Sequence, residues 1–195
     1  IAKRVLGRVK EKIEERAAHG RSAPGLAVVL VGDDSASVLY VRKKRLDCRR
    51  AGIAARDYDL PADVAQAQLV ALIEKLNADD RIHGILLQLP LPAHIQAAEL
   101  IQCISPKKDV DGFHAENIGR LALRQPGLRP CTPRGVMHLL AETGVDLYGK
   151  HAVVVGASTG GSWSAIMMRR ISARIWSALE NETLKSAPEG RALME

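Results

Sequence analysis

The sequence predicts an α/β protein with a parallel, three-layer N-terminal domain, followed by an incomplete Rossmann-like domain. Three observations predict this fold. Short continuous apolar runs alternate with helical patterns along residues 2–89, which is typical of β-α-β-α-β units around a parallel sheet. The apolar run 152–155 leads into a glycine turn, as at the start of another βα unit. A doubly wound domain needs several more strands after that turn, and we expect the remaining residues to be too few to form them.

The first two predicted elements are a helix and a buried strand. Val5, Val9 and Ile13 recur at helical spacing among charged residues, so a helix is predicted over residues 2–19. Residues 26–31 form a continuous apolar run after a Pro-Gly pair. Such a run is typical of a strand that is buried on both faces of a parallel sheet.

The next helix carries Tyr40 and Lys44, the pair on which the functional prediction depends. Its start is marked by residues that can accept hydrogen bonds from free N–H groups, namely Asp34, Ser35 or Ser37, and Gly52 ends it. Within a helix, Tyr40 and Lys44 lie one turn apart on a shared face. A phenol beside an ammonium can hold a flat ring and offer a titratable nitrogen. In a poorly hydrated cleft the lysine would have a lowered pKa and could act as a base.

The basic run 42–45 has a simpler interpretation. Runs of like charge usually form solvated helix faces, so this run alone does not distinguish a surface lysine from a site lysine. Segments further along the chain decide how Lys44 is interpreted.

The remaining elements of the N-terminal domain follow in order. They are a strand over residues 53–60, a helix over 64–76, a strand over 84–89 and a helix near 95–104. The Pro-Leu-Pro sequence at 90–92 cannot continue a central strand. It therefore predicts a loop at the carboxyl end of a strand, where open α/β sheets place ligands.

The later part of the chain contains turn-rich segments and a predicted domain boundary. Thr132 is predicted to cap a helix that has a proline at its first position and runs to about residue 142. We place a linker near residues 119–133 and divide the chain into a catalytic domain over 1–120 and an incomplete nucleotide-binding domain over 121–195. Its glycines Gly156, Gly160 and Gly161 do not form a clean G-x-G-x-x-G. A final amphipathic helix is predicted over residues 163–184.

The charge of the chain allows two kinds of partner. The net charge is +6, and thirteen Lys/Arg against six Asp/Glu in residues 1–50 account for the excess. Only 3% of the residues are aromatic, which leaves few platforms for stacking nucleic-acid bases. A basic cleft for a polyanionic small molecule explains the charge equally well.

The sequence gives no sign of a membrane segment or a metal site. Without a spanning apolar run or a signal-peptide core we expect a cytoplasmic protein. The three cysteines are widely spaced and form no CxxC pair, so neither a disulfide framework nor a zinc site is expected. His114 and His138 are interpreted as surface or packing residues.

Five motifs occur in an order and at a spacing that resemble one known family. They are residues 40–44 (YVxxK), 88–92 (QLPLP), 108–113 (KDVDGF), 129–135 (RPCTPRG) and 155–158 (VGAS). Together, over roughly residues 2–158, they resemble the bifunctional methylenetetrahydrofolate dehydrogenase/methenyltetrahydrofolate cyclohydrolase family. The resemblance implies a folate-binding catalytic domain and a Rossmann domain that binds NADP, flanking a cleft, in a protein that is typically a homodimer.

The resemblance also implies two reactions and a role for each matching residue. The family oxidises 5,10-methylenetetrahydrofolate by hydride transfer to NADP and hydrolyses the methenyl product to 10-formyltetrahydrofolate. Lys44 matches the residue that takes a proton from the attacking water, Tyr40 would stack on the folate, and Gln88 would hydrogen-bond the lysine. Asp111 would accept hydrogen bonds from the pterin N–H edge. The residues against the NADP phosphates would be Gly156, Ala157 and Ser158.

Some of these residues also have a purely structural interpretation. Gln88 can satisfy loop backbone at a strand end, Asp111 can be an ordinary turn residue before a glycine, and Ser158 can cap a helix.

The sequence departs from the family pattern in two places. Leu46 stands where the family commonly carries a second basic residue, and the later Val-Gly-x-Pro and Pro-Gly-Gly-Val-Gly-Pro stretches do not follow Ser158. We therefore expect an incomplete nicotinamide site, and a hydrolysis that does not need it. The competing hypotheses are an inactive folate-binding or partner-binding remnant and a basic nucleic-acid binder.

Overall fold

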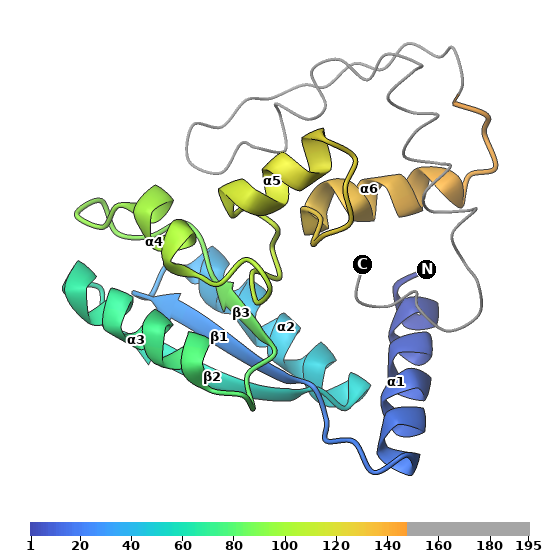
Figure 1. Cartoon of the computed structure of the whole chain (residues 1–195), viewed down its shortest axis with the longest axis horizontal. Coiled ribbons are helices and arrows are strands. Elements are labelled where there is room, and N and C mark those ends of the chain that lie inside the picture. Colours follow the sequence, from blue (N-terminus) through green and yellow to red (C-terminus); the bar gives the residue numbers. More distant parts are fainter. Residues whose placement is uncertain (148–195) are drawn as a thin grey trace. The chain divides into compact units, whose positions relative to one another are not determined.

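The structure is a computed structural model that describes residues 1–147 (Figure 1). The chain divides into two compact units, Ile1–Val110 and Asp111–Glu195. The division into domains 1–120 and 121–195 stays a prediction. The predicted glycine turn with Gly156, Ala157 and Ser158, and the predicted helix 163–184, lie outside the described residues.

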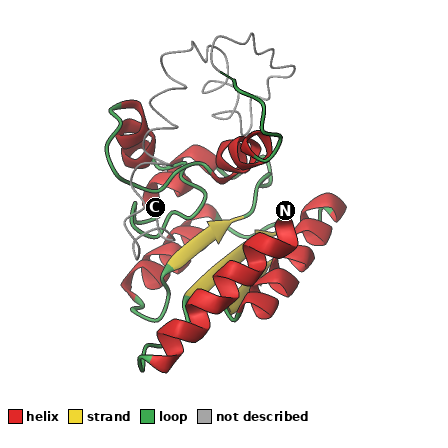
Figure 2. Ribbon diagram, turned by 90° about the vertical axis from the view of Figure 1, so that its right-hand side faces the viewer, coloured by secondary structure: helices red, strands yellow, loops and turns green. Residues whose placement is uncertain are grey.

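The first unit is built on a parallel sheet of three strands, as predicted. The central strand β1 (Gly25–Val31) pairs with β2 (Ala54–Leu60) on one side and with β3 (Gly84–Leu87) on the other. The crossover helices are α2 (Ser35–Ala51) and α3 (Gln66–Ala78). The three strands lie side by side with helices around them (Figure 2).

Helices cover both faces of this sheet, which makes the three layers. One apolar cluster joins the sheet to α3 and to the short helix α4 (Ala97–Cys103). Its buried residues are Ala27, Val29, Val31, Val64, Leu69, Ile73, Leu76, Ile82, Ile85, Leu87, Ile95, Leu100 and Ile104. A smaller cluster joins the opposite face to α2 through Val28, Leu30, Val41 and Leu86. The near-continuous apolar sequence of β1 serves both clusters, because its side chains alternate between the faces.

The helix α1 (Ala2–Ala18) precedes the sheet and none of its residues is buried. It comes close to the end of α2, where a methyl group added at Gly52 would lie 3.3 Å from Ile13 Cγ2. Gly52 ends α2 in the left-handed conformation, with φ 83°. This is the helix end that a glycine provides at low conformational cost.

The second unit begins with two helices, of which only one was predicted. The helix α5 (Ala115–Ala122) is new, and it occupies the start of the segment predicted as a linker. The helix α6 (Cys131–Ala141) has Pro130 at its N-cap position, without a side-chain capping hydrogen bond, so the prediction that Thr132 caps it is wrong. Because the first N–H groups of a helix have no partner within it, Pro133 fits the first turn without lying at its first position.

Among residues 1–147, no helix combines the length and the apolar sequence needed to cross a bilayer.

Candidate active site

Lys44 occupies a core-type position on α2. The buried stripe of this helix consists of Ser37, Val41, Cys48 and Ala51. Position 44 lies three residues after Val41 and four before Cys48, which puts it on the same stripe. The Lys44 side chain is half-buried there. The basic run is therefore not uniformly a solvated helix face.

Tyr40 and Lys44 lie on a shared face, as the helical spacing predicts. Lys44 Nζ is 4.5 Å from the centroid of the Tyr40 ring, within the range of a cation–π interaction. The Tyr40 side chain is 54% exposed, so a large part of its ring is open to a flat ligand.

The start of α2 is fixed by its cap. Asp34 accepts a hydrogen bond from the Ser37 N–H at 2.8 Å. This bond to the Ser37 backbone lowers the pKa of the Asp34 carboxyl. Asp34 is thus the cap among the three predicted candidates.

Gln88 follows β3 on the side of the sheet that faces α2. Its N–H donates to Val29 O at 2.9 Å, so the ladder continues one residue beyond the strand. Because side chains alternate along a strand, Gln88 lies on the same side as Leu86, which packs in the α2 cluster.

The two polar atoms of the Gln88 side-chain amide differ in their hydrogen bonding. Nε2 donates to Leu89 O at 2.6 Å, whereas the buried Oε1 accepts from no donor in the described part of the chain. The hydrogen bond from Gln88 to Lys44 that the family resemblance implies is accordingly not formed between these residues. A buried acceptor without a donor is costly and rare in folded proteins.

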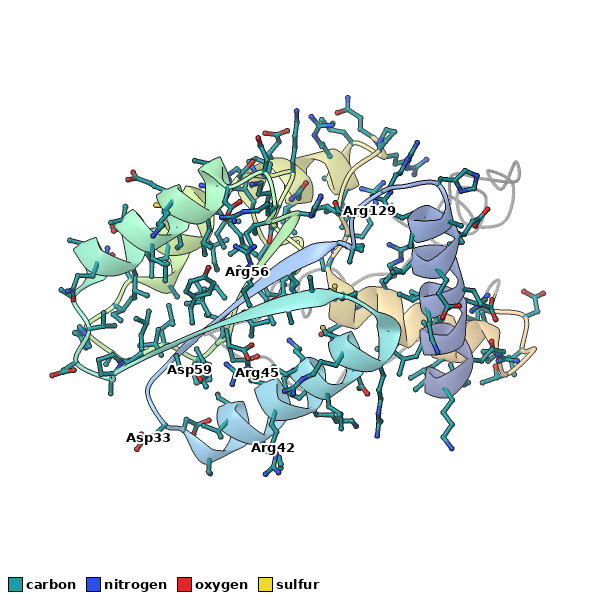
Figure 3. The ribbon with its side chains drawn as sticks, turned by 90° about the horizontal axis from the view of Figure 1, so that it is seen from below. Asp33, Arg42, Arg45, Arg56, Asp59 and Arg129 are labelled. Atoms are coloured by element: carbon teal, nitrogen blue, oxygen red, sulfur yellow. The ribbon has the colours of Figure 1, made fainter. Side chains whose placement is uncertain are left out.

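Arg45, next to Lys44, connects α2 to β2. Its Nε lies 2.8 Å from Asp57 Oδ1, Nη1 donates to Asp59 Oδ2 at 3.2 Å, and Nη2 pairs with Asp59 Oδ1. Figure 3 shows Arg45 and Asp59 pointing toward each other between the two elements, while Arg42 points away from the sheet. The hydrogen bonds to Asp59 raise the pKa of the Arg45 guanidinium. Since this charge is shared with two carboxylates, it does not replace the basic residue missing at Leu46.

Asp111 lies at the start of the second unit and is half-buried. The following Gly112 has φ 68°, and a Cβ there would lie 2.6 Å from the backbone carbon of Arg129 and 2.7 Å from Pro130 N. Only a glycine fits this contact. The turn that carries Asp111 therefore packs directly against the segment that precedes α6.

Sequence reasoning missed the role of Arg45 and that of His114. His114 Nδ1 accepts from the Glu116 N–H at 3.0 Å and caps α5, a use of histidine that no common capping pattern indicates. Asp57 and Asp59 alternate along one face of a strand, which indicates an acidic stripe but does not identify Arg45 as its partner.

The described residues contain no group of three or more His, Cys, Asp or Glu side chains that could hold a metal ion.

Two models of protein families match the chain. The model for the catalytic domain of tetrahydrofolate dehydrogenase/cyclohydrolase matches residues 1–111, which is more than half of the chain. The chain belongs to this family. The model for the NAD(P)-binding domain of tetrahydrofolate dehydrogenase/cyclohydrolase matches residues 130–185. The recognition from five short motifs is thereby confirmed.

Solved structures of the tetrahydrofolate dehydrogenase/cyclohydrolase family are similar to this member. The bifunctional FolD enzyme of Campylobacter jejuni is 42% identical, with a TM-score of 0.79 over 90% of this chain and 60% of that chain. A methylenetetrahydrofolate dehydrogenase of the silkworm Bombyx mori is 37% identical, with a TM-score of 0.77 over 83% of this chain and 56% of that chain.

A third similar structure is the Trypanosoma brucei dehydrogenase-cyclohydrolase, complexed with NADP and an inhibitor. It is 34% identical, with a TM-score of 0.73 over 76% of this chain and 51% of that chain. The present chain thus spans 60% or less of the length of these three relatives.

Proposed function

We propose that this chain binds a reduced folate and hydrolyses its 5,10-methenyl carbon to the 10-formyl product, with Lys44 as the base. The observation that carries the proposal is Lys44, a half-buried residue on the core stripe of α2 with its amine beside the Tyr40 ring. A lysine seldom occupies such a position for stability alone, because its charged group is costly to desolvate.

The chemistry of the substrate requires a base of this kind. The methenyl carbon lies between two nitrogens that share a positive charge, so water can attack it. As the new C–O bond forms, the water must lose a proton, and Lys44 Nζ is the proposed acceptor of that proton. The hydroxyl group of the adduct then loses its proton as the C=O bond of the formyl group forms, the C–N5 bond breaks with its electron pair going to N5, and N5 takes up one proton, so the formyl group stays on N10. The proton taken by Lys44 is finally released to solvent, so the cation and one water give the neutral product and one proton.

Tyr40 and Gln88 would orient the reacting groups. The exposed Tyr40 ring offers a face on which the flat folate can stack. The buried Gln88 Oε1 can accept a hydrogen bond from the Lys44 ammonium or from a folate N–H, which would satisfy an acceptor that the described residues leave without a donor. Since Nε2 is held by Leu89 O, the direction of Oε1 is already fixed.

Asp111 would contribute through the pterin ring. By the family resemblance, its carboxylate accepts hydrogen bonds from the N–H edge of the pterin, a charge-assisted contact that fixes orientation. The close packing of Gly112 on the backbone of Arg129 and Pro130 supports this role, because it holds the Asp111 turn in one conformation.

The oxidation step would use NADP, bound by Gly156, Ala157 and Ser158. These residues fall within the matched NAD(P)-binding domain but outside the described residues. We expect added NADP to raise the melting temperature of the chain if it binds, because a ligand that binds only the folded state stabilises it.

The hydrolysis is tested by the loss of the characteristic absorbance of a 5,10-methenyl substrate. We expect wild type to hydrolyse the substrate faster than Lys44→Met. Lys43→Met is the matched control, since Lys43 is the exposed neighbour on the same helix, and it should keep the wild-type rate. Equal rates for wild type and Lys44→Met would remove the proposed catalytic role.

The same measurements separate the enzyme from a folate-binding remnant. A remnant would bind a folate in a saturable way that depends on Asp111, yet wild type and Lys44→Met would both leave the substrate unchanged.

A further inference from the structure

The outer side of α2 carries a repeat that the proposed site does not use. Counting from Leu39, two consecutive heptads have leucine at the first position and a basic residue at the fourth and fifth positions. These six residues, the heptad face, are all exposed and are Leu39, Arg42, Lys43, Leu46, Arg49 and Arg50. At 3.6 residues a turn they fall within about 120° of the helix circumference, on the side opposite the buried stripe.

The two leucines of the heptad face expose apolar surface along one line of the helix. Leu39 is 69% exposed and Leu46 is 44% exposed, and the neighbouring Val38 is 41% exposed. Single exposed aliphatic residues are common on folded proteins and need no explanation. Two leucines that stand two turns apart beside a valine make a ridge of the kind that packs against another helix in a heptad contact.

The basic side chains of the heptad face have few partners of their own. Those of Arg42, Lys43 and Arg49 form no ion pair or hydrogen bond with any residue among 1–147. Arg50 Nη1 lies 3.5 Å from Asp47 Oδ1, an exposed pair that contributes little to stability. Arg42 points away from the sheet (Figure 3). The heptad face therefore presents cations to a partner, and arginine is the residue that binds carboxylates at two points and is enriched in protein interfaces.

We infer that the heptad face of α2 docks an acidic amphipathic helix of a partner protein. The partner helix places apolar side chains against Leu39 and Leu46 and carboxylates against the basic side chains between them. A second copy of this chain, joined through the same face, would bring like charges together. A helix that lies on a bilayer separates its apolar side from its charged side, whereas leucines and arginines share one side here. Nucleic acid is recognised by basic and aromatic side chains, and it leaves the leucine ridge without a use.

Two synthetic helices test the charge complementarity on the wild-type chain. The probe is a fluorescent peptide of three heptads, with leucine at the first position and glutamate at the fourth and fifth positions of each. Its twin has lysine in place of every glutamate. We expect the wild-type chain to raise the fluorescence anisotropy of the glutamate peptide in a saturable way and to leave that of the lysine peptide unchanged. Any other pattern, including binding of neither peptide, would overturn the inference.

A charge reversal locates the contact on α2. Arg42→Glu/Arg49→Glu should raise the Kd of the glutamate peptide by about tenfold or more and should now bind the lysine peptide, because the charges on both sides of the contact are then exchanged. Lys75→Glu/Lys107→Glu is the matched control. It changes the net charge equally, at two exposed lysines elsewhere in the first unit, and should bind the glutamate peptide as wild type does. Equal Kd values for the two double variants would mean that net charge alone attracts the peptide, and the inference would fail.

The leucines separate a helical partner from other anionic partners. Leu39→Ser/Leu46→Ser should also raise the Kd of the glutamate peptide by about tenfold or more, because the apolar contact is lost. An unchanged Kd, or equally tight binding of wild type to a DNA duplex or to vesicles of phosphatidylglycerol and phosphatidylcholine, would identify a general anion-binding surface and contradict the inference. The variants of the heptad face should keep the hydrolysis rate of wild type, since they alter the side of α2 opposite Lys44. The docking surface and the proposed hydrolysis therefore fail separately.

Discussion

Lys44 and Gln88 are polar residues in places where packing alone favours apolar ones. Lys44 interrupts the buried stripe of α2, and Gln88 Oε1 is buried without a donor from the described residues. Departures from packing rules tend to gather at functional sites, where binding or catalysis requires groups that stability does not. Both positions are therefore consistent with the proposed site, although no hydrogen bond joins the two residues.

Gln88→Met separates the catalytic use of this amide from its structural use. Methionine has a similar length and removes the buried Oε1, so the lost hydrogen bond to Leu89 O is partly offset by the loss of an unsatisfied acceptor. We expect the free energy of unfolding in urea to change by less than about 1 kcal/mol. The hydrolysis rate should fall by about tenfold or more if Oε1 hydrogen-bonds a charged group. A rate equal to that of wild type would make Gln88 a loop residue only.

At the scale of the element, a residue distant in sequence supplies hydrogen-bond donors to the carboxyl end of α3. Lys108 Nζ donates to the carbonyl oxygens of Leu76, Asn77 and Asp79 at 3.0, 2.8 and 2.9 Å. These carbonyl oxygens belong to the last turn of α3 and accept no hydrogen bond within the helix. A cation at this end also complements the helix dipole. Lys108 O in turn accepts from Ile85 N at 2.7 Å. One lysine thus joins α3 to the edge of the sheet.

Lys108→Met should destabilise the chain for this reason. Three donors leave the end of α3, and we expect the free energy of unfolding to fall by about 2–3 kcal/mol, the size of a lost charged hydrogen bond. Lys107→Met is the matched control, because Lys107 is exposed, and it should change stability little. Equal urea midpoints for the two variants would show that the carbonyls find other donors.

Asp79, at the same end of α3, makes the stability of the chain depend on pH. The Arg81 guanidinium and the Arg81 N–H donate to its carboxylate, with Arg56 Nη1 at 3.1 Å, and they hold the pKa of the Asp79 carboxyl well below its usual range. A lowered pKa in the folded state stabilises the chain above the ordinary carboxyl pKa of about 3.9, and this contribution is lost as the pH falls toward the lowered value.

The expected result is a difference in melting temperature between wild type and Asp79→Asn that depends on pH. Asp79→Asn should unfold at a lower temperature than wild type at neutral pH, and the gap should narrow as the pH falls below about 4. Asp80→Asn, which changes the exposed neighbour, should show no such gap at either pH. A gap of constant size for Asp79→Asn would mean that packing, rather than charge, is responsible.

For the whole molecule, the sequence predicted the elements that depend on local patterns. The β-α-β-α-β order, the parallel sheet and the shared face of Tyr40 and Lys44 all follow from periodicity. The short helix α5 was missed because its cap, His114, is unusual. The contacts of Arg45 and Lys108 were missed for another reason. They join residues 12 to 32 positions apart, and such pairs are not encoded by any local period.

The location of the core leads to a prediction about the first unit alone. Both apolar clusters of the described residues lie between Leu26 and Val110, and Lys44 has its ring contact within the same unit. A fragment of residues 1–110 should therefore unfold cooperatively in urea, since it retains a complete layered core. It should also keep the contact between Lys44 and the Tyr40 ring, observed as a ring-current shift of the Lys44 Cε protons, because both residues lie on α2. A fragment that shows no cooperative transition would mean that the first unit depends on later residues. A folded fragment without the shift would mean that the sheet forms alone but that the contact between Lys44 and Tyr40 depends on later residues.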